Sequence, residues 1–361
     1  MGLAQSLPAG PDSRTCALPE VLLTADGAAP EPGAVRRSAW SWVFAGALAA
    51  VLLYLSLRGV DWRQVWAVME GARWRYLAIA CLVSSVSYFL RAVRWRILLN
   101  AEGHLSIGTT FAANMAGYLG NSLLPARAGE LIRTFIISSR SSLSKTYVLT
   151  TALAERMTDA IALVLWSSVV LLGIHPKPRW LEDASRATTL IAAAGALAIV
   201  ILPHTGSLCD TIIARIPVSA AMRGRLLRLA DQILSGLRAF HDIRRLAGFV
   251  LLTVAIWGLD AGGVMIGARA LRLNVTFPMA ALLICGLGLG SALPSTPGYV
   301  GIFQFVAVTV LVPFGIPRDS ALAFILVAQA LGYVVVLVLG LPGVMQYRGW
   351  RSTVRSTPAS G

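Results

Sequence analysis

The sequence predicts an all-α polytopic membrane protein with about eight transmembrane helices and one or two re-entrant or broken segments. Of its 361 residues, 56% are hydrophobic and only 13% are charged, whereas soluble domains are about 45–50% apolar and about 25% charged. Apolar stretches recur along the chain, and most are long enough to cross the roughly 30 Å hydrocarbon core of a bilayer. Few charges and recurring apolar stretches together indicate repeated membrane crossing.

Nine apolar stretches are candidates for these helices, at about 40–57, 76–98, 107–125, 147–173, 188–203, 246–268, 278–294, 298–316 and 320–344. Two of them, 107–125 and 278–294, are short, contain glycines and end at a proline. Since proline and glycine interrupt helices, these two stretches are predicted to be broken or re-entrant segments.

Residues 1–39 precede the first apolar stretch and are rich in Ala, Pro, Gly and Ser. This composition is typical of disorder, so we expect a disordered cytoplasmic N-terminal segment. The apolar stretch that follows lies far from the N-terminus and precedes no clear cleavage site, so it is interpreted as a retained anchor. The helical membrane domain is then predicted at residues 40–345, followed by a short basic tail at 346–361.

A polar insertion at residues 204–245 contains seven arginines. Apolar residues recur within it at three- and four-residue spacing, namely Met222, Leu226, Leu229, Ile233, Leu237 and Phe240. This pattern is typical of a basic amphipathic helix. Two placements fit it equally well, on the cytoplasmic membrane surface or packed against the helix bundle.

The net charge of +14 is explained by basic cytoplasmic loops rather than by nucleic acid, for which the chain has no recognisable motif. We expect a multi-pass protein of the plasma (inner) membrane, with the N-terminus, the 204–245 insertion and the tail in the cytoplasm. Five apolar stretches separate the N-terminus from the insertion, so one of them must not span. We expect this to be 107–125, while 278–294 either spans or re-enters.

The chain also repeats a motif. GYLGNSLLPARAG (117–129) and GLGLGSALPSTPG (286–298) align without gaps at an offset of 169 residues, and each ends one of the two short segments. Paired short segments broken by Gly and Pro are typical of transporters built from repeats, with the binding site at the repeat interface. An inverted repeat is one arrangement that this pattern allows.

Charged residues inside or beside apolar stretches are the candidate functional residues, because a charge at the bilayer centre costs roughly 2.5–3.5 kcal/mol. They are Arg91, Arg94, Arg127, Glu130, Arg133, Glu155, Arg156, Asp159 and Asp260. On a helix Glu155 and Asp159 share one face, and nearby arginines in the 121–133 motif, Arg127 and Arg133, are their expected partners. Asp260 has no evident partner in the sequence.

Two interpretations of these charges stay open. They form a binding site for an anionic lipid phosphate, held by arginines and by free backbone N–H groups beside broken helices. Alternatively they are salt bridges that anchor the segments at the membrane interface, and Arg91 and Arg94 extend to the lipid headgroups.

Four motifs carry a resemblance to a known family: RAVRWR (91–96), NSLLPARAGELIR (121–133), ALAERMTD (152–159) and LPSTPGYVG (293–301). In this order they resemble the flippase-like lysylphosphatidylglycerol synthase transmembrane-region family, which includes the membrane half of multiple peptide resistance factor. The resemblance covers roughly residues 40–345. No segment like the aminoacyl-transferase domain follows, so we do not expect lysyl transfer.

The family's motif positions fall here on Arg91, Arg94, Asn121, Pro125, Arg127, Gly129, Glu130, Arg133, Glu155, Arg156, Asp159, Pro294, Pro297, Gly298 and Gly301. The resemblance implies that all of these except Pro125 and Gly129 bind the substrate, and Asp260 is added from its charge alone. Family members often carry an acidic residue shortly after the PGxxG motif, where this chain has Gln304. The difference places a proton-coupling role at that point in doubt.

The expected function is that of a lipid flippase or transporter for an anionic phospholipid or a polyprenyl or other lipid-linked phosphate. The alternatives are a membrane enzyme acting on lipid phosphate and a non-transporting scaffold that binds envelope-lipid biosynthetic enzymes. No catalytic motif is recognisable, and four cysteines and four histidines are dispersed, so neither enzymatic activity, a metal nor a cofactor is expected. The sequence does not determine the oligomeric state.

Overall fold

A computed structural model describes residues 46–47, 49–124, 128–172, 242–291 and 297–356, with a few isolated residues between 189 and 227. The chain divides into Met1–Phe44 and Ala45–Gly361, and every described residue belongs to the second unit. The predicted disordered segment 1–39 therefore lies outside the described residues. So do most of the apolar stretch 188–203 and most of the basic insertion 204–245.

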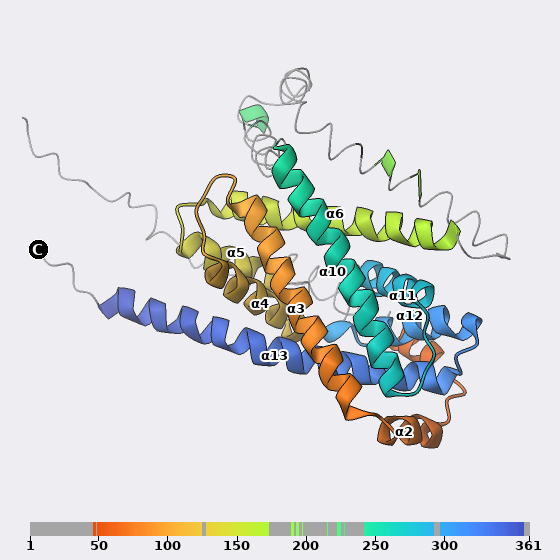
Figure 1. The fold of residues 1–361 in the computed structure, drawn as a ribbon. Coiled ribbons are helices and arrows are strands. Elements are labelled where there is room, and N and C mark those ends of the chain that lie inside the picture. The colour runs from red at the N-terminus through yellow and green to blue at the C-terminus, as the bar shows by residue number, and fades with distance from the viewer. Residues whose placement is uncertain are drawn as a thin grey trace, which may run out of the picture. The chain divides into compact units, whose positions relative to one another are not determined.

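The described residues form helices and connecting segments, with no β-strand among them (Figure 1). In chain order the elements are α2 (Trp62–Glu70), α3 (Trp74–Leu99), α4 (Ile107–Leu123), α5 (Gly129–Ser139), α6 (Lys145–Leu172), α10 (Ile243–Ala270), α11 (Phe277–Gly290), η4 (Pro297–Tyr299), α12 (Ile302–Leu311), η5 (Val312–Phe314) and α13 (Arg318–Ser356). Side-chain caps begin several of them. Ser106 accepts a hydrogen bond from the backbone N–H of Thr109 at α4, and Asp242 accepts one from that of Arg244 at α10.

The long helices agree with the predicted apolar stretches. The helices α3, α6 and α10 coincide with 76–98, 147–173 and 246–268, whereas α13 contains 320–344 and continues to Ser356, into the predicted basic tail. Three segments, namely α3, α10 and the Arg318–Met345 part of α13, are long and apolar enough to cross a membrane, and Phe277–Gly290 and Ile302–Phe314 are shorter apolar helices. The structure is thus that of a helical membrane protein, while the total of about eight spans stays a prediction.

Two helices were not predicted from the sequence, α2 and α5. Glu130 and Arg133 of the 121–133 motif lie in the first turns of α5. They lower the local hydropathy, so a search for apolar stretches does not identify this helix. The predicted single stretch at 298–316 is also divided. Positive φ angles at Gly298, Tyr299 and Gly301 end η4 and begin α12 anew.

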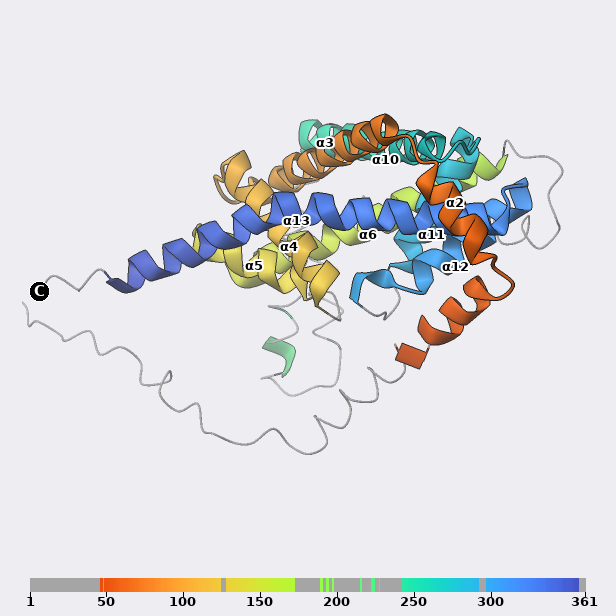
Figure 2. The ribbon, with the colours of Figure 1, turned by 90° about the horizontal axis from the view of Figure 1, so that it is seen from below.

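The order of helix lengths repeats along the chain. A long helix, two short ones and a long one form the first half (α3–α6), and the second half (α10–α13) follows the same order. The backbone N–H of Arg73, before α3, donates to the carbonyl of Ala270 at the end of α10 over 2.8 Å. Figures 1 and 2 show α3 and α10 side by side. These two equivalent helices are therefore antiparallel, as an inverted repeat requires.

The glycines of the repeated motif have different structural roles in the two halves. The helices α4 and α5 approach so closely that a Cβ atom on Gly129 would lie 1.9 Å from the carbonyl oxygen of Gly117. The backbone N–H of Gly129 also donates to Oδ1 of Asn121 over 2.9 Å. The equivalent Gly298 instead has a φ of +71°, a backbone conformation that favours glycine.

Two large hydrophobic clusters hold the helices together. One contains the buried side chains of Trp95, Leu98, Ile137 and Phe249 and connects the first half to α10. The other includes Leu283, Leu311 and Phe324 and occupies mainly the second half. The candidate site described below uses side chains from both halves.

Candidate functional site

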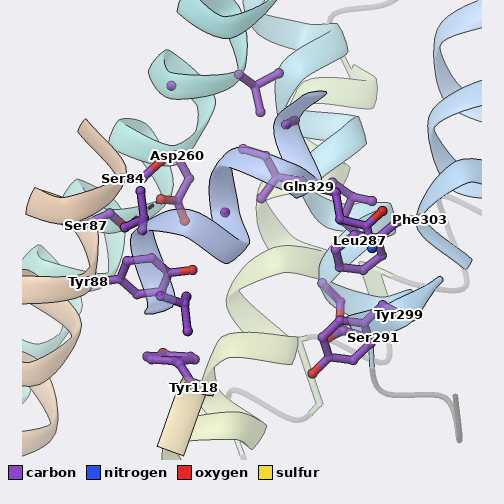
Figure 3. A pocket seen from close by; sticks show the side chains of 18 of the residues that line it. Ser84, Ser87, Tyr88, Tyr118, Asp260, Leu287, Ser291, Tyr299, Phe303 and Gln329 are labelled. Carbon is purple, nitrogen blue, oxygen red and sulfur yellow. Dashed lines mark hydrogen bonds between the residues drawn. The ribbon is translucent and has the colours of Figure 1, made fainter. Parts of the chain in front are cut away.

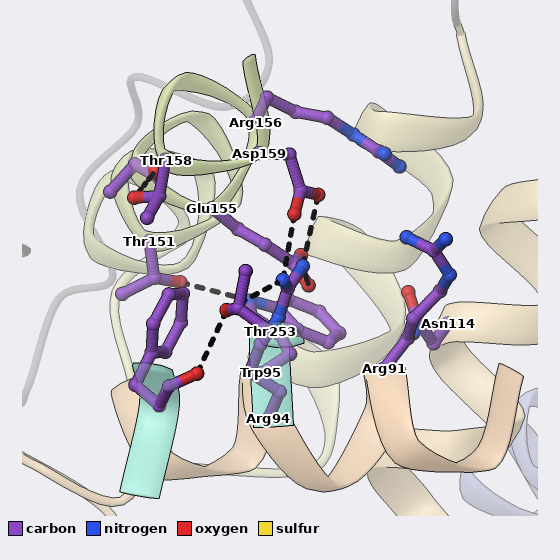
Figure 4. Close-up of polar contacts among 12 residues, drawn as sticks. Arg91, Arg94, Trp95, Asn114, Thr151, Glu155, Arg156, Thr158, Asp159 and Thr253 are labelled. Carbon is purple, nitrogen blue, oxygen red and sulfur yellow. Dashed lines mark hydrogen bonds and ion pairs between the residues drawn. The ribbon is translucent and has the colours of Figure 1, made fainter. Parts of the chain in front are cut away.

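Arg94 is the centre of a buried ionic network. Its guanidinium, which is 0% exposed, donates to Oδ1 and Oδ2 of Asp159 over 2.7 and 2.9 Å and to Oε1 of Glu155 over 3.0 Å. A fourth hydrogen bond of 3.1 Å reaches Oγ1 of Thr253 on α10. Figure 4 shows Glu155 and Asp159 extending from α6 toward this arginine of α3. Glu155 and Asp159 share one helix face, as predicted, which lets one arginine bind both.

A second buried arginine extends the network into the α4–α5 hairpin. Arg133 donates to Oε2 of Glu155 over 2.9 Å, to Oδ1 of Asn114 over 3.0 Å and to Oε2 of Glu130 over 2.6 Å. The other oxygen of Glu130 accepts a hydrogen bond of 2.9 Å from Nε of Arg156. Arginines and carboxylates therefore alternate along a series of ion pairs that begins on α3, continues through α6 and α5, and returns to α6.

A separate ion pair joins the two halves. Arg91 on α3 lies 2.5 Å from Oδ2 of Asp260 on α10, and the Ser87 hydroxyl donates to the other Asp260 oxygen over 2.5 Å. The Arg91 guanidinium also lies 4.8 Å from the ring centroid of Trp257, a favourable cation–π contact. Together the network and this pair contain four arginines and four carboxylates, all paired, so their formal charges cancel.

The structure corrects three expectations about these charges. Asp159 pairs with Arg94 rather than with Arg133, whereas Glu155 pairs with Arg133 as expected; Arg127 lies outside the described residues. Arg94 is fully buried, so it does not extend to lipid headgroups. Asp260 has a partner after all.

Asp260 and its partner Arg91 occupy equivalent positions of the repeat. Arg91 and Asp260 are 169 residues apart, which is also the offset between the two copies of the repeated motif. Because the equivalent helices α3 and α10 are antiparallel neighbours, equivalent positions near their middle come into contact. The repeat alignment shows that the two residues are equivalent, and the antiparallel packing of α3 and α10 brings them together.

A cavity of about 460 Å³ lies beside the network (Figure 3). Five charged side chains line it, namely Arg91, Glu130, Arg156, Asp159 and Asp260. The side chains of Arg94, Arg133 and Glu155 do not, and at 0–1% exposed they are buried behind this wall. The predicted site residues thus separate into a cavity lining and a supporting layer.

The remaining predicted residues take different places. Asn121 and Gly298 line the cavity. Pro297 begins η4, and Gly301, which precedes α12, donates its backbone N–H to Oε1 of Gln304 over 2.8 Å. Pro125 and Pro294 lie outside the described residues.

The opposite wall of the cavity is polar but uncharged, and sequence reasoning did not find it. Gln329 on α13 accepts a hydrogen bond of 2.7 Å from Gln304 and donates to the hydroxyl of Tyr333 and the carbonyl of Gly298. The ring of Tyr299 stacks on Phe303, with centroids 5.0 Å apart. These neutral groups carry no charge signal in a hydropathy profile.

Gln329 nevertheless occupies a position related to Arg156. Each lies eleven residues after the start of its helix, α6 for Arg156 and α13 for Gln329. Each is bonded to a residue in the first turn of the preceding short helix, Glu130 of α5 or Gln304 of α12. The second half therefore replaces an ion pair of the first half by a pair of amides.

The cavity wall does not resemble a metal centre. Among the described residues, no three His, Cys, Asp or Glu side chains are grouped as a metal ion would require. The carboxylates that line the cavity each contact an arginine. Within this part of the chain, the arrangement favours binding of a polar group through hydrogen bonds.

Comparisons with known proteins agree with the helical membrane fold. The chain is 27% identical to glycosyltransferase AglD of Haloferax volcanii over 84% of this chain, but it spans only 54% of that protein. It is 23% identical to a UPF0104 membrane protein of Pyrococcus horikoshii, covering 85% of this chain and 96% of the relative. A UPF0104 membrane protein of Methanothermobacter thermautotrophicus is 21% identical, with coverage of 87% and 95%.

The family model described as the lysylphosphatidylglycerol synthase TM region matches residues 42–340. This match includes all the motifs on which the resemblance rested and every residue that lines the cavity. The resemblance is confirmed: this chain belongs to the lysylphosphatidylglycerol synthase TM region family.

Proposed function

We propose that this protein moves a lipid with an anionic headgroup, a phospholipid or a polyprenyl or other lipid-linked phosphate, between the leaflets of the membrane. The observation that supports the proposal is a cavity that helices of both halves of a helical membrane protein enclose and that five charged side chains line. Polar side chains in such a protein are costly unless they are paired or line a wet cavity, and they mark substrate pathways. A polar cavity would hold the headgroup while the acyl chains stay in lipid.

Arg156 is the residue best suited to receive a phosphate. It lines the cavity, its side chain is 27% exposed, and its ion pair with Glu130 uses Nε and leaves the two terminal nitrogens for a ligand. Arg91 is a second donor beside the cavity, although it is less exposed at 12%. Arginine suits phosphate because its planar donors match two phosphate oxygens.

We further propose a multi-pass plasma-membrane protein with about eight spans and with the N-terminus and the 204–245 insertion in the cytoplasm. Envelope-lipid biosynthetic enzymes are the proposed partners. Single cysteines introduced into either segment should react with an impermeant thiol reagent only from the cytoplasmic side. Labelling of both from the outside would contradict this topology.

Leaflet exchange tests the function. Purified full-length protein in liposomes should accelerate the exchange of a headgroup-labelled anionic lipid without changing it chemically. Arg156→Gln should slow the exchange about tenfold, as expected for loss of a charge-assisted hydrogen bond. Arg75→Gln, at an exposed position of α3, is the matched control and should behave as the wild type. Wild-type exchange no faster than in empty liposomes would refute transport.

The second candidate is a membrane enzyme that acts on lipid phosphate, and one observation favours it: the relative AglD is named a glycosyltransferase. The chain spans only about half of that protein, so the activity belongs to this chain only as an alternative. Appearance of a new lipid product in the exchange assay would favour the enzyme. A non-transporting scaffold is the third candidate and predicts neither exchange nor product.

A further inference from the structure

The charged and uncharged groups that line the cavity differ in the hydrogen bonds they already make. Five lining side chains are charged, and each is held in an ion pair. Ten others are hydroxyls or amides. Most polar groups offered to a ligand in this part of the chain are therefore uncharged.

Several of the uncharged groups have no hydrogen-bond partner among the described residues. The hydroxyls of Tyr88, Tyr118, Tyr299 and Ser84 line the cavity and make no hydrogen bond to another residue in the described ranges. A tyrosine or serine hydroxyl both donates and accepts. A polar group without a hydrogen-bond partner inside a protein costs free energy. A ligand that supplies the missing hydrogen bonds therefore binds more tightly.

These groups face each other across the cavity. Figure 3 shows Ser84, Tyr88 and Tyr118 on one side and Tyr299 and Gln329 on the other. Hydroxyls on two opposing walls suit a ligand with hydroxyls around its whole edge. A compact phosphate, which carries acceptors and no donor when fully ionised, leaves the acceptor capacity of the tyrosines unused.

Tyr299 adds an aromatic surface. Its ring is stacked on Phe303 at an interplanar angle of 11°, and both line the cavity. A flat ring pair offers an apolar face next to the polar groups of Gln329 and Tyr333, and binding sites combine such apolar surface with a few placed polar groups to orient a ligand. The apolar C–H face of a sugar-like ring would lie on this surface while its hydroxyls reach the walls.

From these observations we propose that the cavity binds an uncharged, hydroxyl-rich ring, of the glycosyl or cyclitol class, as part of the lipid headgroup. This inference rests on the proposed function, in which the cavity holds the headgroup of a lipid. It adds the chemical class of that headgroup. The phosphate contributes charge at Arg156, and the ring contributes hydrogen bonds to the tyrosine hydroxyls and to Oε1 of Gln329, because both hydrogens of the Gln329 amide are already donated to Tyr333 and Gly298.

Lipid binding tests the proposal separately from transport. The full chain in detergent is titrated with three lipids of identical acyl chains: phosphatidic acid, phosphatidylinositol and monoglucosyldiacylglycerol. Phosphatidylinositol, which has both the phosphate and the ring, should bind about tenfold more tightly than phosphatidic acid, equivalent to one or two net hydrogen bonds. Monoglucosyldiacylglycerol, which has the ring but no phosphate, should bind about as tightly as phosphatidic acid, because the gain from the ring offsets the loss at Arg156. Tyr299→Leu and Gln329→Leu should each remove most of the preference for phosphatidylinositol over phosphatidic acid, whereas Gln64→Leu, exposed on α2, should retain it.

The outcomes separate the two proposals. Tighter binding of phosphatidic acid than of phosphatidylinositol, equal binding of all three lipids, or no specific binding of any would overturn the ring assignment. Exchange of an anionic lipid in liposomes would then still support transport. Conversely, a ring preference without exchange keeps the binding class and refutes transport. Thermal melting of each variant identifies any that misfold. If a variant misfolds, the preference of the wild-type protein among the three lipids still tests whether the cavity binds a ring.

Discussion

Replacing Arg94 with Met should cause the largest loss of stability among single changes in the ionic network. The substitution retains an unbranched apolar chain of similar reach but removes every hydrogen bond that joins α3 to Asp159 and Glu155. Glu155 keeps Arg133, whereas Asp159, which is 6% exposed, loses its only ion-pair partner among the described residues. Leaving one buried charge without its partner typically costs about 3–5 kcal/mol.

A double-mutant cycle isolates this effect. In Arg94→Met/Asp159→Asn the unpaired carboxylate is gone, so the double variant should be more stable than Arg94→Met alone. The coupling energy should be about 1–3 kcal/mol, the upper part of the range for residues in one network. Arg75→Met, at an exposed position on the same helix, should change stability by less than about 0.5 kcal/mol.

Reversible unfolding of the purified protein in mixed detergent micelles, followed by circular dichroism, measures these differences. The reasoning is refuted if Arg94→Met unfolds within about 1 kcal/mol of the wild type. It is also refuted if the double variant loses the sum of the two single losses, because the carboxylate and the arginine would then not be coupled.

Three further predictions concern neighbouring contacts. Arg133→Gln should destabilise the protein by about 3 kcal/mol in the same unfolding assay, because Glu130 and Glu155 both lose a buried cation; a change below about 0.5 kcal/mol would contradict the buried pairing. Gly129→Ala should sharply lower the yield of folded protein on size-exclusion chromatography, since its Cβ would clash with the Gly117 carbonyl, while Gly108→Ala has open space and should not. Gln304→Leu should cost about 1–2 kcal/mol by removing two neutral hydrogen bonds, to Gln329 and from the Gly301 N–H, and a loss as large as that of Arg133→Gln would contradict the distinction between the two halves.

The membrane class and the long helices could be predicted from the sequence because hydropathy is a local property. A bilayer requires about 20 consecutive apolar residues for each spanning helix, so 76–98 and 246–268 identified α3 and α10 without any knowledge of packing. The repeat at an offset of 169 residues was equally visible. In contrast, α5 was missed because Glu130 and Arg133 lower its hydropathy, and their partners on α6, Arg156 and Glu155, are known only from the tertiary structure.

The sequence by itself determined that this chain is a helical membrane protein of its family, and that its intramembrane charges must find partners. Only the tertiary structure decided which partners they find. Arg94 meets Asp159 across 65 positions of the chain, and Arg91 meets Asp260 across 169. Such pairs depend on which faces of two helices pack together, and helix packing is set by contacts among side chains distant in sequence. The cavity with its uncharged wall around Gln329 arises from the same packing, so the composition of the chain does not predict it.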